Sequence, residues 1–333
     1  MIARDLFDIP QGLVCGGFPG PARPHPPRFR RLQKNHQRDY NDKEHAVRIR
    51  HFRHNYRFVK SHNRAGKTYK LKINHLADRS DDELTRLRDD CLPGQETTAF
   101  SSIKAVQKKD IPTEIDWRLY GAVTPVKDQA ICGSCWSFGT VGSVEGALFV
   151  KTGKLVKLSE QNLVDCSWGY GNNACDGGEE WRAYEWIMKH GGIATDESYG
   201  PYLGADGYCH YNSSNTVIGA RIASYVNVTS GDEEALKMAI AVQGPTAVGI
   251  DAAHKSFSFY SHGVFYEPDC KNGPDDLDHA VLAVGYGDLN GEPYWLVKNS
   301  WSTYWGNDGY VLMSRKDNNC GVTTDATYVN IAA

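Results

Sequence analysis

A glycine-containing apolar segment that begins at Cys135 limits how this chain can fold. Residues 135–150 follow helical periodicity, and Gly153 supplies a stop signal after them. Each glycine inside a helix costs roughly 1 kcal/mol relative to alanine. A helix that contains three of them is expected to be buried, with other elements packed closely on its glycine positions. The apolar face consists of Val141, Val144 and Leu148, and the glycines are Gly139, Gly142 and Gly146.

Cys135 and two distant residues together point to a reaction. Cys135 opens the helix, whereas His279 and Asn299 follow far downstream. A thiol at a helix amino terminus is acidified by the helix dipole, a histidine can hold its proton, and an amide can hold the histidine. These residues predict a cysteine nucleophile for acyl transfer.

The residues around Cys135 also resemble a known family. The run from Cys132 to Trp136 reads CGSCW, which together with a distant His and Asn is typical of papain-like cysteine proteases. The likeness is to the cathepsin L-like members and extends from about Gln33 to the C-terminus. It implies an α+β papain-like fold, with a helical left domain, a β-barrel-like right domain and the active cleft between them. It also implies a small α-helical prodomain before these domains.

The resemblance implies a role for each residue of the site. In the active enzyme, Cys135 is a thiolate paired with protonated His279, which later protonates the leaving amine. Asn299 orients the imidazole. Gln129 donates its side-chain amide to the oxyanion, together with the backbone N–H of Cys135.

Several residues near the cleft carry further expectations. Trp301 is expected to cover the His–Asn pair and Trp305 to line the side that binds the leaving portion, with core aromatics as the alternative for both. Three small residues depart from the family pattern, which commonly has glycine there: Ala130, Ala174 and Ser302.

A substrate pocket is implied by residues on both sides of the cleft. Gly177 and Gly178 are expected to present backbone to an extended peptide. Two glutamates follow them where the family often has apolar side chains, and the second is Glu180. The resemblance places Asp325 at the floor of the same pocket and Gly249 on its wall. We expect an acidic pocket that tolerates Arg or Lys at the second residue before the cut (P2), with solvated surface carboxylates as the alternative.

A β-hairpin is predicted around Asn290-Gly291, because the segments 279–286 and 294–299 have strand character on either side of this turn signal. If the turn is centred near residue 289, residues 279 and 299 face each other across antiparallel strands. His279 and Asn299 would then be neighbours.

Seven of the nine cysteines lie within residues 111–333, so at least one of these seven is unpaired there or pairs elsewhere. The resemblance implies the pairs Cys132–Cys175, Cys166–Cys209 and Cys270–Cys320, which leaves Cys135 outside them. Cys15 and Cys91 have no family counterpart, and their pairing stays open.

The net charge of −3 conceals two regions of opposite sign. Residues 1–110 contain 23 Lys and Arg against 13 Asp and Glu, whereas residues 111–333 contain 14 against 27. The two regions should attract each other at neutral pH. Nucleic acid is not an expected partner of the basic region, because its charges alternate with acidic residues and no recognition motif is present.

The basic region is expected to be an inhibitory prosegment. Ile49, Phe52, Tyr56 and Val59 recur at helical spacing, which predicts an amphipathic helix over 44–63. These residues resemble the ERFNIN pattern of the family's propeptides. A strand with alternating Tyr69, Leu71 and Ile73 and a second helix, which opens with a capping box at 80–83 and contains Leu84 and Leu87, are expected to follow. The second family pattern is incomplete, because Lys72 and Leu76 stand where Gly and Phe are usual.

We therefore expect residues 1–32 to be a Gly/Pro-rich extension or linker, 33–110 the inhibitory prodomain and 111–333 the mature peptidase domain. Cleavage is expected near Lys108-Lys109-Asp110 and to be triggered by acid, since acid neutralises carboxylates and charges seven prosegment histidines. The cysteines and the sequons at Asn212 and Asn227 indicate a lysosomal or secreted, glycosylated protein, although the first residues are not a signal peptide. Residue 1 is therefore expected not to be the native start.

Other classes of function fit the sequence less well. A thiol–disulfide oxidoreductase using Cys132 and Cys135 would need them to pair, and a zinc site lacks a second pair of ligands. A catalytically inactive binding homologue would not require Gln129, Cys135, His279 and Asn299 together. No metal or cofactor is predicted. No membrane span is predicted either, because no stretch approaches the roughly 18 apolar residues that a span requires. The expected partners are peptide or protein substrates, the chain's own propeptide and cystatin-like inhibitors.

Overall fold

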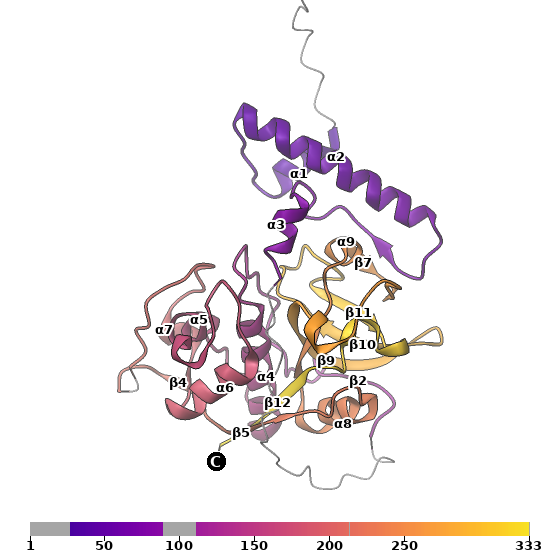
Figure 1. Cartoon of the computed structure of the whole chain (residues 1–333). Coiled ribbons are helices and arrows are strands. Elements are labelled where there is room, and N and C mark those ends of the chain that lie inside the picture. The colour runs from indigo at the N-terminus through magenta and orange to yellow at the C-terminus, as the bar shows by residue number, and fades with distance from the viewer. Residues whose placement is uncertain (1–26, 89–110, 213, 333) are drawn as a thin grey trace, which may run out of the picture.

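The computed structural model describes residues 27–88, 111–212 and 214–332. These residues form a prosegment layer, a helical half and a sheet half. A helical layer of prosegment residues lies across one end of the molecule (Figure 1). Below it lie a helical half and a sheet half, and α3 (Asp81–Thr85) points toward their junction. This arrangement confirms the expected α+β class, with two halves preceded by a small helical unit.

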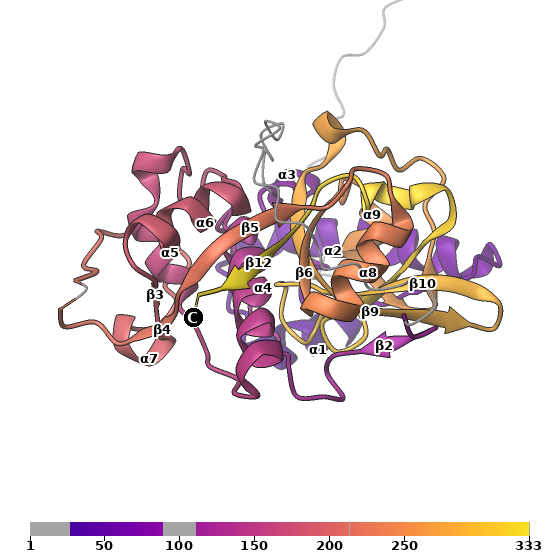
Figure 2. The same ribbon diagram turned by 90° about the horizontal axis from the view of Figure 1, so that it is seen from below.

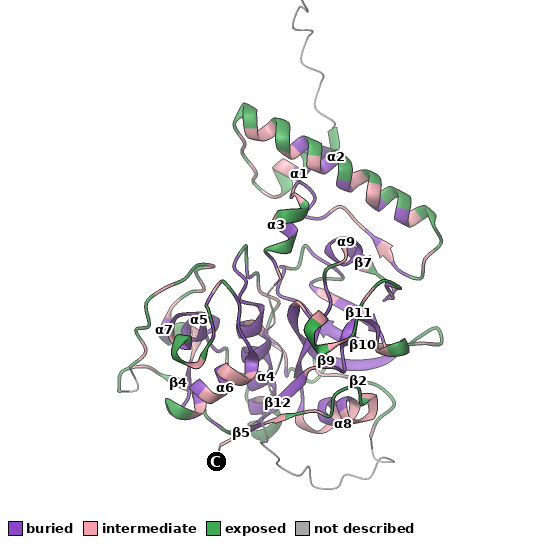
Figure 3. Ribbon diagram, in the orientation of Figure 1, coloured by how far each residue is buried: buried purple, intermediate pink, exposed green. Residues whose placement is uncertain are grey.

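The prosegment unit is built on one long amphipathic helix, α2 (Asp42–Arg64), whose extent confirms the prediction. Its outer surface is exposed, whereas Phe52 and Val59 are buried (Figure 3). A preceding helix, α1 (Pro27–Asn35), packs Phe29 against Phe52 with ring centroids 5.3 Å apart. The expectation of a linker up to residue 32 therefore fails for residues 27–32, because their apolar side chains cover α2.

Two smaller prosegment predictions needed correction. The capping box at Ser80 and Glu83 is present and opens α3, but this helix ends at Thr85, before Leu87. The predicted strand over 69–73 is reduced to β1 (Lys70–Leu71), which pairs with β7 (Tyr260–His262) of the sheet half. Cys15, Cys91 and the predicted cleavage site lie outside the described residues.

The helical half is centred on α4 (Cys135–Thr152), which is buried over most of its length (Figure 3). Its glycines are required for close packing, as predicted. A Cβ on Gly142 would lie 2.6 Å from Leu282 Cδ2, and one on Gly146 would lie 2.5 Å from Pro245 Cδ. Around α4 lie α5 (Glu160–Cys166), η2 (Trp168–Tyr170), α6 (Glu180–Lys189), α7 (Asp196–Tyr199) and the small sheet of β3 (Ile193–Ala194) and β4 (Ile218–Ala220).

The sheet half contains an eight-stranded sheet in the order β5-β12-β6-β9-β10-β11-β8, with β2 added beside β9. All pairs are antiparallel except β11 with β8. Helix α8 packs against the sheet on the side seen in Figure 2. The elements are β2 (Ile115–Asp116), β5 (Ile222–Asn227), α8 (Glu233–Gln243), β6 (Thr246–Ile250), α9 (Lys255–Ser258), β8 (Val264–Phe265), η3 (Pro274–Asp276), β9 (His279–Leu289), β10 (Glu292–Lys298), β11 (Tyr310–Ser314), η4 (Lys316–Gly321) and β12 (Ala326–Ile331).

The predicted hairpin forms between β9 and β10, but its predicted register is wrong. Leu289 faces Glu292 across the two-residue Asn290-Gly291 turn, so the turn is centred beyond residue 289. An irregularity after Leu296 then shifts the register by one residue, and β10 ends at Lys298. His279 consequently pairs with Ile250 of β6 and not with Asn299.

Three disulfides stabilise the two halves, and they are the pairs implied by the resemblance: Cys132–Cys175, Cys166–Cys209 and Cys270–Cys320. Cys135 is in none of them. Among the described residues no helix combines the length and apolar character that a membrane crossing requires. Asn212 and Asn227, the sequon asparagines, are both exposed.

Candidate active site

The sulfur of Cys135 lies where the two halves of the molecule meet. Cys135 is the first residue of α4 and is fully buried. Its Sγ accepts a hydrogen bond from the backbone N–H of Ala280 in β9, at 3.4 Å. Ala280 directly follows His279, so the sulfur of one half lies beside the imidazole-bearing strand of the other. This contact brings the predicted nucleophile and base together.

His279 is held by Asn299 and covered by Trp301. His279 Nε2 lies 2.8 Å from Asn299 Oδ1, and the rings of His279 and Trp301 have centroids 4.8 Å apart. If Nε2 donates to the Asn299 oxygen, the imidazole is fixed with Nδ1 turned elsewhere. Nδ1 is buried and has no hydrogen-bond partner among the described residues, so it is the ring nitrogen available to a reacting group.

Burial lowers the pKa of His279 to about 4, although the hydrogen bond to the side-chain oxygen of Asn299 acts in the opposite direction. The Arg88 guanidinium of the prosegment lowers it further. The imidazole is therefore neutral at pH 7 in this precursor. The imidazolium expected for the active enzyme is not the state of the precursor, because the docked prosegment removes water and adds a positive charge nearby.

Gln129 presents its side-chain amide to the prosegment. Its Nε2 donates to the carbonyl oxygens of Leu87, at 3.1 Å, and of Cys132, at 2.8 Å. The hydroxyl of Ser300 donates to Gln129 Oε1 at 2.5 Å and so orients the amide. The Leu87 carbonyl thus occupies the donor that was predicted for an oxyanion.

The side chain of Arg88, the next prosegment residue, reaches across the cleft to the wall that carries Ala252 and Asp278. Its Nη1 donates to the carbonyl of Ala252 at 3.0 Å and lies 3.4 Å from Asp278 Oδ2. Leu87, Arg88 and Asp278 were not predicted as site residues. Asp278 had one usable signal, its place directly before His279. The family resemblance implies that the prosegment tail runs through the cleft, but no sequence pattern identified Leu87 and Arg88 as the residues that fill it.

The two tryptophans differ in what they contact. Trp301 packs on the imidazole, as expected. Trp305 is fully buried against Trp301 and Phe257, and its Nε1 donates to the Phe257 carbonyl at 2.9 Å. Trp305 is therefore a core aromatic in the precursor, which was the alternative for this residue.

The predicted substrate pocket brings together two carboxyl groups, of which Glu180 is buried and Asp325 half-buried. Glu180, the first residue of α6, is buried, and burial followed by the charge of Asp325 raises its pKa to about 8. Burial also raises the pKa of Asp325. A Cβ on Gly249 would lie 3.7 Å from Asp325 Cβ, so Gly249 borders the same region. The alternative of solvated surface carboxylates does not describe these groups.

The two glycines shortly before Glu180 are required for different structural reasons. Gly177 has φ +110°, a backbone conformation that side chains rarely adopt. A Cβ on Gly178 would lie 2.8 Å from Trp136 Cε2. The family's usual glycines at three other positions are explained in the same way, because the residues that replace them here have φ between 49° and 65°: Ala130, Ala174 and Ser302.

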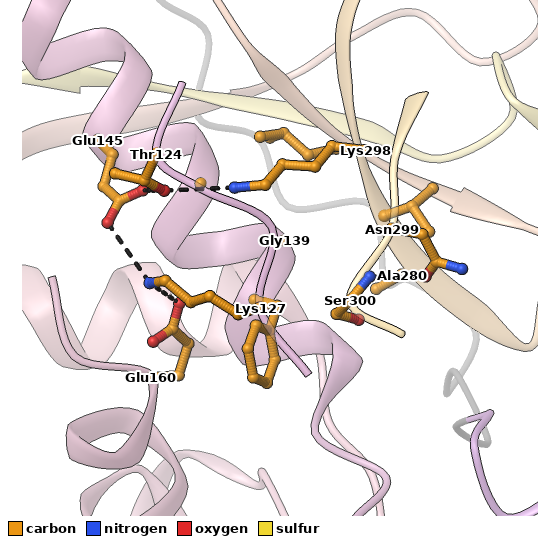
Figure 4. A pocket seen from close by; sticks show the side chains of 13 residues that line it. Thr124, Lys127, Gly139, Glu145, Glu160, Ala280, Lys298, Asn299 and Ser300 are labelled. Atoms are coloured by element: carbon orange, nitrogen blue, oxygen red, sulfur yellow. Dashed lines mark hydrogen bonds and ion pairs between the residues drawn. The ribbon is translucent and has the colours of Figure 1, made fainter. Parts of the chain in front are cut away.

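Four buried charged side chains line the same pocket as Asn299 and Ser300 (Figure 4). Lys127 forms ion pairs with Glu160 and with Glu145, the latter at 3.7 Å. Burial lowers the pKa of Lys127, but the two glutamates more than offset this, so the net shift is upward. Lys298 lies one residue before Asn299, and its burial lowers its pKa to about 8. The cluster joins α4 and α5 to β10 and so couples the helical half to the strand that leads to Asn299.

The described residues offer little for other chemistries. Cys132 is bonded to Cys175, so the Cys132–Cys135 exchange pair of the oxidoreductase alternative is not formed. Asp251, His254 and Cys270 lie close enough to suggest a metal site, but Cys270 is committed to its disulfide with Cys320.

Comparison with family models divides the chain in the same way as the structure does. The model described as papain family cysteine protease matches residues 111–330. The model described as cathepsin propeptide inhibitor domain (I29) matches residues 29–84. This range includes most of α1, the whole of α2, and α3 except for its last residue.

Individual relatives are similar over most of their length. The chain is 47% identical to a cathepsin L-like peptidase of Aedes aegypti over 311 residues, covering 88% of this chain and 89% of the relative. It is 48% identical to digestive cysteine proteinase 1 of Homarus americanus over 277 residues, covering 82% and 84%. Among solved structures, digestive procathepsin L 3 of Tenebrio molitor larval midgut superposes with a TM-score of 0.80 at 37% identity, covering 91% of this chain and 97% of that one.

Proposed function

The chain belongs to the papain family of cysteine proteases, and we propose that Cys135, His279, Asn299 and Gln129 are its catalytic residues. It is a cathepsin L-like cysteine endopeptidase in zymogen form, with a propeptide inhibitor domain. The observation that carries the assignment is the 3.4 Å hydrogen bond from the backbone N–H of Ala280, the residue after His279, to Cys135 Sγ. His279 is itself hydrogen-bonded to Asn299 at 2.8 Å. Loss of peptidase activity in Cys135→Ala tests it.

The reaction follows from these positions. After the prosegment leaves, the Cys135 thiolate attacks the scissile carbonyl, and the new C–S bond places negative charge on the carbonyl oxygen. Gln129 Nε2 and the Cys135 N–H stabilise that oxygen. The C–N bond then breaks while His279 gives its proton to the leaving amine. Water, deprotonated by His279, hydrolyses the thioester and restores the thiolate.

The prosegment inhibits by occupying these groups. Leu87 takes the Gln129 amide, and Arg88 bridges to Asp278 beside the base. We place the inhibitory prodomain at residues 27–110 because α1 is part of its packing, with the peptidase domain at 111–333. Maturation near residues 108–110 then releases the cleft.

Acid should trigger that release, and buried prosegment histidines supply a reason. Burial, followed by repulsion from protonated His36 and from Arg38, lowers the pKa of His75 to about 3. Its ring lies 6.0 Å from that of Tyr304 of the peptidase domain. Because His75 binds a proton more tightly once it is released, docking loses stability as pH falls from about 6.5 toward 3. At pH 4.5 this amounts to roughly 2 to 3 kcal/mol.

Asp278 loses its charge in the same pH range but does not add to the release. Burial raises its pKa to about 6, although Arg88 acts to lower it. Its ion pair with Arg88 is present above pH 6, but a carboxyl that is buried binds its proton more tightly than an exposed one, so protonation of Asp278 does not favour the undocked state.

We expect purified precursor to process itself much faster at pH 4.5 than at pH 7.5, and His75→Gln to move the activation midpoint toward lower pH because the proton acceptor is gone. Gel analysis over pH 4 to 7.5 measures this. His54→Gln, at an exposed position of α2, is the matched control and should behave as the unaltered chain. Equal processing at pH 4.5 and 7.5 would contradict acid triggering, and an unmoved midpoint would remove His75 from it.

We also propose that the pocket containing Glu180 and Asp325 accepts a basic side chain at P2, since both carboxyl groups lie in it. Their raised pKa values mean that the charge appears only as pH rises, so the Arg-to-Phe ratio of kcat/KM should increase about tenfold or more between pH 5 and pH 8. Paired peptides that differ only in Arg or Phe at P2 measure it in the matured enzyme. Glu185→Gln, on the same helix, is the control for Glu180→Gln. A large preference for Phe that persists unchanged in Asp325→Ala would rule the acidic pocket out.

The compartment and inhibitors follow as proposals from the same properties. Three disulfides favour an oxidising or lysosomal setting, and we place the protein in lysosomes or among secreted proteins. Cystatin-like proteins are proposed as inhibitors because they would have to enter the cleft that the prosegment fills.

A further inference from the structure

Asp278 and the backbone of Ala252 form a binding site for a guanidinium group beside the candidate base His279, and this site is called the receptor below. The backbone N–H of Ala252 donates to Asp278 Oδ1 at 2.7 Å and fixes the carboxylate. Oδ2 lies 3.4 Å from Arg88 Nη1, and the same nitrogen donates to the Ala252 carbonyl at 3.0 Å. The Arg88 side chain keeps only 12% of its exposure there. A side chain of this chain therefore already shows what the receptor binds.

The receptor has a defined place relative to the bond that is cut. Leu87 has its carbonyl on Gln129, and the next residue reaches across to the wall that carries His279. His279 must protonate the departing amine, so the residue that carries this amine lies against the same wall. Asp278 directly precedes His279, which puts its carboxylate on the leaving-group side of the cleft.

We infer that Asp278, together with the Ala252 carbonyl, selects arginine or lysine as the first residue on the leaving-group side of the scissile bond. The inference rests on the proposed function and adds a substrate class to it. In the precursor Arg88 occupies this receptor, so a basic substrate residue and the prosegment compete for one carboxylate.

The charges around Asp278 determine when the receptor works. Arg88 from the prosegment, Asp251 after β6, His254 before α9 and the adjacent His279 surround it. Asp251 is itself bonded to His254, with Oδ2 3.3 Å from Nε2, so its charge is partly balanced. Because burial raises the pKa of Asp278 to about 6, selection for a cation should be present at pH 7 and fade below pH 5.

The test uses internally quenched peptides that are identical except for arginine, citrulline or leucine directly after the scissile bond. Citrulline keeps the shape of arginine without its charge. In matured enzyme at pH 7 the arginine peptide should have about tenfold higher kcat/KM than the citrulline peptide, and the ratio should approach one at pH 4.5 and in Asp278→Asn. A ratio near one in the unaltered enzyme at pH 7, or an unchanged ratio in Asp278→Asn, would overturn the inference.

A second measurement needs no variant. The acyl-enzyme formed from a peptide ester can be trapped by argininamide or by citrullinamide in competition with water. The amine nitrogen bonds to the acyl carbon, the C–S bond breaks, and His279 takes the proton. Argininamide should give about tenfold more aminolysis product per unit concentration at pH 7, and equal partitioning would contradict the inference. Hydrolysis of a peptidyl coumarin amide, which has no leaving-side residue, separates this failure from failure of the protease assignment.

Discussion

Replacing Cys135 by alanine should abolish peptide hydrolysis by the matured domain and stop self-processing of the precursor. Removing the nucleophile of a hydrolase that acts through a covalent intermediate costs roughly 10⁶-fold in kcat. The substitution removes one buried sulfur, whose described contact is the weak hydrogen bond from the Ala280 N–H. The free energy of unfolding should therefore change by only about 1 kcal/mol.

This expectation is checked by incubating both precursors at pH 4.5 and following the loss of the prosegment by gel and the hydrolysis of a peptidyl coumarin amide. Cys91→Ala is the matched control, because it removes another cysteine, and one that lies before the predicted cleavage site and is therefore absent from the matured domain. It should retain hydrolysis of the peptide. Turnover by Cys135→Ala that survives further purification would show that another residue is the nucleophile.

Replacing Gln129 by alanine should lower kcat of the matured enzyme about 10²- to 10³-fold, with a smaller effect on KM. The Gln129 amide is oriented by Ser300, and in the matured enzyme it interacts most strongly with the charge that develops on the substrate oxygen, so its loss affects the transition state most. The same amide holds the Leu87 carbonyl in the precursor. Gln129→Ala should therefore also weaken inhibition by the isolated prosegment.

Steady-state kinetics on one coumarin amide, together with titration by the prosegment, measure both effects. Ser300→Ala keeps the amide donor but frees its orientation, and should lose roughly tenfold or less. A Gln129→Ala enzyme with normal kcat would exclude the side chain from the oxyanion site. A normal kcat with weakened prosegment binding would assign it to inhibition alone.

The sequence predicted best those elements whose local pattern and packing agree. The glycine spacing after Cys135 predicted a buried helix. The structure explains the glycines, because a Cβ at Gly146 or Gly142 would lie 2.5 to 2.6 Å from Pro245 or Leu282. The amphipathic helix of the prosegment was found because its apolar positions recur at helical spacing. The stretch before it was misjudged as linker, because glycines and prolines ahead of residue 27 concealed two apolar side chains, Phe29 and Leu32, that pack as part of a helix.

The geometry of the site was less accessible from sequence. The pairing of His279 with Asn299 was expected from a turn centred near residue 289. The turn lies at Asn290-Gly291 and β10 ends at Lys298, so the two backbones do not pair and only the side chains meet. The neutral state of His279 depends on burial under the prosegment and on Arg88, which are tertiary effects. The residues that fill the cleft in the precursor could not be identified, because their docking depends on surfaces far away in the chain.

The proposed reaction requires the sulfur of Cys135 to be a nucleophile once the prosegment has left. Treatment with an irreversible peptidyl epoxide, followed by mass spectrometry of the digested protein, tests this directly. We predict one equivalent of label on Cys135 in acid-matured enzyme and little label in precursor held at pH 7.5, where Leu87 and Arg88 occupy the cleft. Label on a different residue, or a matured protein that takes up no label, would contradict the account.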